Sequence, residues 1–97
     1  MLFRSGVVLL MDVRHPLKDY DQQVLHWCYA AELQTHVLLT KADKLKRGPA
    51  QSALLQTRKA LQNLHPEASI QLFSAHTRAG SDELQQVLHM WLGTTEV

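Results

Sequence analysis

The chain has 97 residues, 45% of them hydrophobic and 20% charged, which is the composition of one globular domain and leaves no room for a second core. The formal net charge of +1 gives no overall bias, so composition provides no argument for binding to nucleic acids or to a membrane surface. No stretch approaches the roughly 20 apolar residues of a membrane span, and the single cysteine excludes an internal disulfide. We therefore expect a soluble cytoplasmic protein with Cys28 packed in its core.

The first half of the chain predicts a strand, a helix and a second strand. Residues 6–11 form a continuous apolar run, typical of a strand buried on both faces. A helix is expected from about residue 19 to residue 33, begun by a capping box between Asp19 and Gln22. Residues 35–40 repeat the apolar strand pattern. The helix positions that we expect to be buried are Tyr20, Val24, Trp27, Cys28 and Ala31.

The second half predicts a helix, a third strand and a last helix. A Gly-Pro pair at residues 48–49 places proline at the first helical position, and a His-Pro pair at residues 65–66 ends that helix. Residues 69–74 alternate more strongly, which favours an edge strand. Ser81 is expected to cap the last helix and Gly93 to close it. The buried stripes are predicted at Ala53, Leu54, Thr57, Ala60, Leu61 and Leu64, and at Leu84, Val87, Leu88, Trp91 and Leu92.

Strands and helices alternate, which predicts an α/β fold with three layers, α/β/α, around a three-stranded parallel sheet. If the strands lie side by side in chain order, right-handed crossovers put the first two helices on one face and the third on the other. We expect residues 1–97 to form a single domain.

Polar residues follow each predicted strand, and parallel strands end at the same edge of a sheet, where ligands of open α/β folds bind. These residues are Asp12, the tetrapeptide Thr-Lys-Ala-Asp at residues 40–43, and Ser74 with Ala75. The carboxylate of Asp43 can only accept hydrogen bonds. Guanine offers it two adjacent N–H donors and adenine does not, so the tetrapeptide predicts a guanine reader.

Two longer segments extend this match: Met-Asp-Val-Arg-His-Pro-Leu-Lys-Asp-Tyr-Asp at residues 11–21 and Leu-Leu-Thr-Lys-Ala-Asp-Lys-Leu at residues 38–45. With Ser-Ala-His at residues 74–76, they resemble the C-terminal half of a translation-factor-class GTPase domain, which is half of a P-loop GTPase fold. Within that class, the two longer segments look like the EngB-type bacterial ribosome-biogenesis GTP-binding proteins. The resemblance covers nearly all of residues 6–92.

The resemblance implies a role for each matching residue. Asp43 would accept the guanine N1 and N2 protons, and the stem of Lys41 would lie over the purine plane. The backbone N–H of Ala75 would donate to the guanine O6, and Thr40 would brace the turn through its hydroxyl. The implied guanine-binding set is Thr40, Lys41, Asp43, Ser74, Ala75 and His76, with His76 where relatives often have Lys or Leu.

The sequence lacks three motifs of that family: the phosphate-binding loop Gly-x-x-x-x-Gly-Lys-[Ser/Thr], the Asp-x-x-Gly switch and the metal-ordering threonine region. We therefore expect a partial G domain that carries the base-recognition half. GTP or GDP would be its nucleotide. The magnesium that accompanies GTP in the full-length family would find no ligands in this chain, and we expect the chain alone not to hydrolyse GTP. The implied cellular roles are ribosome biogenesis, cell division and septation.

A basic rim surrounds the predicted ligand edge, and it could contact phosphates of large-subunit ribosomal RNA. Its members are Arg14, Lys18, Lys44, Lys46 and Arg47, with His15 and Lys41 nearby. An alternative of another class is a non-catalytic α/β module that presents this basic loop to RNA or protein. A third is phosphotransfer with Asp12 as nucleophile, although no second carboxylate follows it to hold magnesium. We instead expect Asp12 to order its loop, together with Arg14.

The six histidines show no metal-binding spacing, so we expect no metal site. In the G-domain fold the outer side of the strand at residues 6–11 would pair with the strand before the phosphate-binding loop. Without that strand, an open edge and a partly uncovered last helix predict that the chain self-associates or is only marginally folded.

Overall fold

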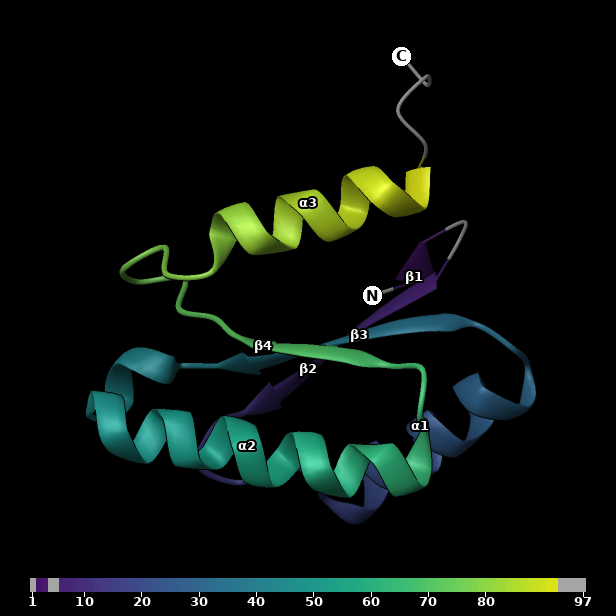
Figure 1. Ribbon diagram of the computed structural model, residues 1–97, viewed down its shortest axis with the longest axis horizontal. Coiled ribbons are helices and arrows are strands. Elements are labelled where there is room, and N and C mark those ends of the chain that lie inside the picture. Colours follow the sequence, from purple (N-terminus) through teal and green to yellow (C-terminus); the bar gives the residue numbers. More distant parts are fainter. Residues whose placement is uncertain (1, 4–5, 93–97) are drawn as a thin grey trace.

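The computed structural model describes residues 2–3 and 6–92 and shows an α/β fold (Figure 1). Its elements are β1 (Leu2–Phe3), β2 (Gly6–Asp12), α1 (Asp19–Ala30), β3 (Gln34–Thr40), a 3-10 helix (Ala42–Lys44), α2 (Arg47–Leu64), β4 (Ser69–Leu72) and α3 (Ser81–Leu92). β2, β3 and β4 are parallel neighbours in that order, with β4 at the edge. In Figure 1, α1 and α2 lie below the sheet and α3 crosses above it. The predicted fold class is confirmed.

β1 is an element that the sequence did not predict. Leu2 pairs with Val7 and Phe3 pairs with Gly6, in the antiparallel direction, on the outer side of β2. The expectation that this edge is open is therefore wrong at the start of β2. A second copy of the chain would find less of the edge to pair with.

The hydrophobic core lies between the sheet and the layer of α1 and α2. Alternate strand residues enter it, including Met11 of β2, Leu39 of β3 and Ile70 of β4. Leu25 of α1 and Leu61 of α2 pack against them. Full burial of one such side chain stabilises a fold by about 1.5–3 kcal/mol, so this layer is the main source of stability.

Polar contacts organise the face under α3. His36 lies with Nδ1 2.6 Å from Ser69 Oγ and Nε2 2.7 Å from Gln71 Oε1. The Gln71 amide donates to the carbonyl oxygens of Leu72, at 3.0 Å, and Gly80, at 2.8 Å. Because that amide nitrogen is the donor, Oε1 accepts, and His36 must carry its proton on Nε2. This network joins β3 and β4 to the loop before α3.

The apolar stripe of α3 is only half-buried at Leu84, Val87, Leu88 and Trp91. The Trp91 ring covers Gly6, where an added Cβ would lie 3.1 Å from the ring. The predicted contribution of Leu92 and the predicted closure by Gly93 fall outside the described side chains.

The buried face of α1 agrees only in part with the prediction. Cys28 is buried as predicted and Val24 is half-buried, but Leu25 is also buried, and Tyr20 and Trp27 are 71% and 59% exposed. The inward stripe includes Asp21, whose carboxylate accepts the backbone N–H of Lys18 at 3.1 Å. This cap stands in place of the predicted box between Asp19 and Gln22. Ala31 follows the helix and is exposed.

α1 also ends earlier than predicted. The N–H of Leu33 donates to Cys28 O at 2.9 Å and the N–H of Glu32 donates to Tyr29 O at 3.1 Å, with Glu32 in the left-handed region at φ 59°. These two bonds form a Schellman motif, which stops a helix by satisfying its last carbonyls. Glutamate is unusual at a position that favours glycine, so the sequence contained no stop signal.

Three further boundaries differ from the predictions. α2 begins at Arg47, so Pro49 is its third residue; this is tolerated because first-turn N–H groups need no intrahelical acceptor. α3 has Ser81 as its first residue, and Gly80 O accepts the first helical N–H, from Leu84, at 3.0 Å. β4 ends at Leu72 because Ser74 N donates to Ala79 O at 2.9 Å, within the loop.

Gly80 provides a test of the loop that the Gln71 network holds. Its φ is 88°, and an added Cβ would overlap Leu72 O and lie 2.7 Å from Gln71 Nε2. We expect Gly80→Ala to lower the free energy of unfolding by roughly 2–4 kcal/mol, measured by urea denaturation. Gly48→Ala is the matched control, because nothing lies within 4 Å of its added Cβ. We expect the control to be neutral or stabilising by up to about 1 kcal/mol. Equal effects of the two substitutions would contradict this account.

Candidate functional site

The carboxyl ends of β2, β3 and β4 meet at one edge of the sheet. Asp12 is the register partner of Thr40, and the Val13 N–H donates to Thr40 O at 3.0 Å. The Phe73 N–H donates to Leu39 O at 2.9 Å, just beyond the end of β4. These backbone bonds place the three predicted polar segments side by side.

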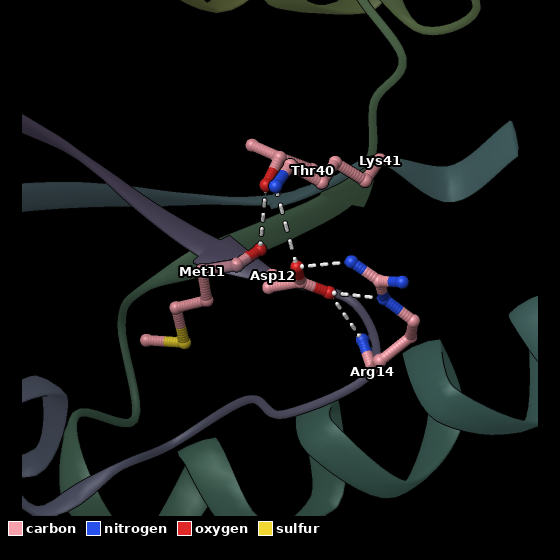
Figure 2. Close-up of polar contacts among 5 residues, drawn as sticks. All are labelled: Met11, Asp12, Arg14, Thr40 and Lys41. Carbon is pink, nitrogen blue, oxygen red and sulfur yellow. Dashed lines mark hydrogen bonds and ion pairs between the residues drawn. The ribbon is translucent and has the colours of Figure 1, made fainter. Parts of the chain in front are cut away.

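Thr40 and Lys41 turn the chain at this edge. The Thr40 hydroxyl donates to Met11 O at 3.2 Å, which links the end of β3 to β2 (Figure 2). Lys41 has the left-handed conformation, φ 60°, and its carbonyl accepts the N–H of Lys44 at 2.9 Å. A left-handed non-glycine residue is uncommon and stores strain, which is frequent at ligand-binding turns.

Ser74 fixes the carboxylate of Asp43. The Ser74 hydroxyl donates to Asp43 Oδ1 at 2.7 Å, and Ser74 Oγ accepts the Thr77 N–H at 3.2 Å. Ser74 is completely buried, whereas Asp43 is exposed. The hydrogen bond from Ser74 holds the pKa of the Asp43 carboxyl below its ordinary value of 3.8, with smaller contributions from the charges of Lys44 and His76. Asp43 is therefore ionised at neutral pH and can only accept hydrogen bonds.

A cavity of about 460 Å³ opens beside this carboxylate. Its lining contains five of the six predicted site residues, while Ser74 lies buried and reaches the site through Asp43. Sequence reasoning missed two apolar lining residues, Leu10 and Phe73. The alternation of β2 gives a signal for Leu10, because Leu9 and Met11 point to the opposite face, toward α1 and α2. The complete lining is Leu10, Thr40, Lys41, Asp43, Lys44, Phe73, Ala75 and His76.

Asp12 lies between two cations (Figure 2). Its Oδ1 accepts the backbone N–H and Nε–H of Arg14, at 2.9 and 3.0 Å, and its Oδ2 accepts from Arg14 Nη2 at 2.9 Å. Lys41 Nζ lies 3.8 Å from the same Oδ2. The hydrogen bonds from Arg14 hold the pKa of Asp12 well below its usual range. The expectation that Asp12 orders its loop with Arg14 is confirmed, and a carboxylate engaged in this way is a poor nucleophile.

The basic residues of the predicted rim occupy different settings. Arg14 is committed to Asp12, and Lys44 lines the cavity. Lys18 and Lys46 stand at the N-terminal caps of α1 and α2, and Arg47 is the first residue of α2. All five side chains are exposed.

Across residues 2–3 and 6–92, no group of three or more His, Cys, Asp or Glu side chains is placed to hold a metal ion. Within the same part of the chain, no helix is both long and apolar enough to cross a membrane.

No protein-family profile matches the chain. It is 49% identical over 84 residues to "Probable GTP-binding protein EngB" of Acinetobacter baumannii, a match that covers 87% of this chain and 40% of the relative. The protein of the same name from Acinetobacter baylyi is 48% identical over 84 residues, with coverage of 87% and 35%. That from Stenotrophomonas maltophilia is 47% identical over 90 residues, with coverage of 92% and 45%. The chain thus spans less than half the length of these curated relatives.

Among solved structures, the chain resembles translation elongation factor SelB from Methanococcus maripaludis. The apo form gives a TM-score of 0.80 at 20% identity and covers 95% of this chain and 21% of that one. The complex of the same factor with the GTP analogue GPPNHP gives a TM-score of 0.77 at 22% identity, with coverage of 96% and 21%. At this level of identity the likeness establishes the fold.

The contact between Ser74 and Asp43 predicts a measurable pH dependence. In Ser74→Ala the pKa of Asp43 should rise toward 3.8, because the hydrogen bond to the ionised form is lost. The lowered pKa stabilises the wild-type fold above the unfolded pKa of about 4, and this advantage disappears as pH falls through the folded value. Carbon NMR of the Asp43 carboxyl between about pH 2 and 6 would measure the shift. Ser52→Ala, on the exposed face of α2, is the control and should leave the titration unchanged. The same titration curve in both variants would contradict the assigned contact.

Proposed function

We propose that this chain, which is homologous over most of its length to the EngB-type GTP-binding proteins as its motifs predicted, binds a guanine nucleotide through the base. The observation that carries the proposal is the Asp43 carboxylate, held by Ser74 at the wall of a cavity at the ligand edge of the sheet. A fixed carboxylate that is already ionised matches the paired N–H donors of guanine.

The residues around Asp43 could provide the other contacts that a bound purine requires. Leu10, Phe73 and the stem of Lys41 offer apolar surface to a flat ring, and the cavity volume of about 460 Å³ exceeds that of one base. Ala75 also lines the cavity, and in this proposal its backbone N–H would donate to a carbonyl such as guanine O6. Adenine would bring an acceptor at N1 toward a carboxylate that can only accept, so the pairing that guanine makes would be lost.

Nucleotide hydrolysis is not part of the proposed activity of this chain. The sequence contains four glycines, and none begins a phosphate-binding loop of the form Gly-x-x-x-x-Gly-Lys-[Ser/Thr]. The described residues also do not fit a magnesium ion, because they bring no suitable set of carboxylates together. GTP and GDP are therefore expected to be recognised here by the base and not by the phosphates.

We further propose that the chain contacts ribosomal RNA of the large subunit. It would do so in the cytoplasm, during ribosome assembly that is linked to cell division. Support comes from the exposure of Lys18, Lys44, Lys46 and Arg47 around the candidate site, since clustered cations attract phosphates.

Self-association through the remaining outer edge of β2 is a further proposal, tested by light scattering. A monomer at high micromolar concentration would contradict it.

Base selectivity tests the proposed function directly. NMR titration of this chain with GMP, AMP and XMP should give at least about tenfold tighter binding of GMP than of AMP, equal to about 1.4 kcal/mol. Asp43→Asn should weaken GMP binding and favour XMP, because the amide presents a donor where guanine also has one and xanthine has a carbonyl oxygen. Asp82→Asn, in the exposed first turn of α3, is the matched control. Equal affinity for GMP and AMP, or unchanged GMP affinity in Asp43→Asn, would remove the assignment.

A further inference from the structure

Lys41 is restrained at both ends of its side chain. At the backbone it has φ 60°, fixed by the turn bond from the Lys44 N–H. At the other end its ammonium lies 3.8 Å from Asp12 Oδ2, on the neighbouring strand. Figure 2 shows the side chain running back across the end of β3 toward Asp12. A lysine with 59% of its side chain exposed would otherwise sample many rotamers.

Lys41 is one of the residues that line the candidate base cavity. Asp12 itself is absent from that wall, and 21% of its side chain is exposed. Asp12 can therefore influence a ligand in the cavity only through the side chains that its carboxylate contacts. One of these is Lys41, and the other is Arg14, which likewise does not line the cavity.

We propose that Asp12 is a positioning residue of the base site: its carboxylate holds the Lys41 ammonium over β2, so that the methylene stem stands as a preformed apolar wall for a purine ring. This inference rests on the proposed function, because it assumes that a purine occupies the cavity. A side chain that is ordered before binding loses less conformational freedom when the ring packs against it. Arg14 has the opposite role, since it competes with Lys41 for the same Oδ2.

The size of the effect follows from the geometry. A partly exposed ion pair is worth little, about 1 kcal/mol or less, which is a factor of about five in affinity. The effect should be independent of which purine is bound, because the stem contacts the ring and reads no donor or acceptor. This separates Asp12 from Asp43, whose replacement should change selectivity.

A double-mutant cycle tests the proposal on the 97-residue chain. Asp12→Asn should weaken GMP and IMP binding by the same factor, about fivefold, in NMR titrations. In a Lys41→Met background the same substitution should have no effect, because the group through which Asp12 acts is gone. Asp12→Glu should recover part of the affinity by restoring the charge. Arg14→Ala should not weaken binding, since it leaves Asp12 free to pair with Lys41.

Three outcomes would overturn the inference: an unchanged affinity in Asp12→Asn, an undiminished effect of that substitution in the Lys41→Met background, or equal weakening by Asp12→Asn and Arg14→Ala. The last would mean that Asp12 only orders its own loop. A second readout needs no nucleotide: NMR relaxation of the Lys41 ε-methylene should show faster motion in Asp12→Asn than in wild type. Unchanged motion would refute the restraint. If the wild-type chain fails to bind GMP, the proposed function fails, while the relaxation measurement still decides whether Asp12 restrains Lys41.

Discussion

The parallel register of β2 and β3 is the constraint on which the candidate site depends. Because Asp12 is paired with Thr40, the residue after Thr40 can bring its side chain within reach of the Asp12 carboxylate. A slip of one residue would turn Asp12 to the opposite face of the sheet and move the core residues outward. The burial of Met11 and Leu39 against the α1 and α2 layer therefore holds the site in place as well as the fold. Packing on one face of the sheet sets the polar geometry at its edge.

The two faces of the sheet are stabilised by different interactions, hydrophobic packing on one and polar contacts on the other. The candidate site lies beside the less apolar face. The α1 and α2 face has continuous hydrophobic packing. The other face is joined to α3 through His36, Gln71 and Gly80, and the stripe of α3 stays half-buried. Leu10 points to this second side, where it is 53% exposed and lines the cavity. An exposed leucine in the middle of a strand is what a site for an apolar ring requires.

The sequence was informative where one physical signal determines the structure. The three apolar runs predicted the parallel strands, and the polar residues after them predicted which side chains meet. It was less informative where a residue departs from its usual role. Trp27 was assigned to the core for its hydrophobicity, yet it is exposed, and the polar Asp21 is buried, where it accepts the backbone N–H of Lys18. The left-handed Glu32 ends α1 without the expected glycine. β1 is only two residues long, too short for any periodicity to reveal.

The carboxylates of Asp12 and Asp43 lie at the same edge of the sheet but differ in their hydrogen-bond partners, and therefore in what they can bind. Asp12 is saturated by the backbone N–H and guanidinium of Arg14 and is approached by Lys41, so its charge is neutralised within the protein and has little capacity for a ligand. Asp43 receives a neutral hydroxyl from Ser74, which orients the carboxylate and keeps it ionised without cancelling its charge. A ligand with paired N–H donors would therefore be attracted to Asp43 and not to Asp12, although both stand at strand ends. The identity of the partner, cation or hydroxyl, decides which carboxylate is engaged within the protein and which one stays available at the cavity to accept hydrogen bonds.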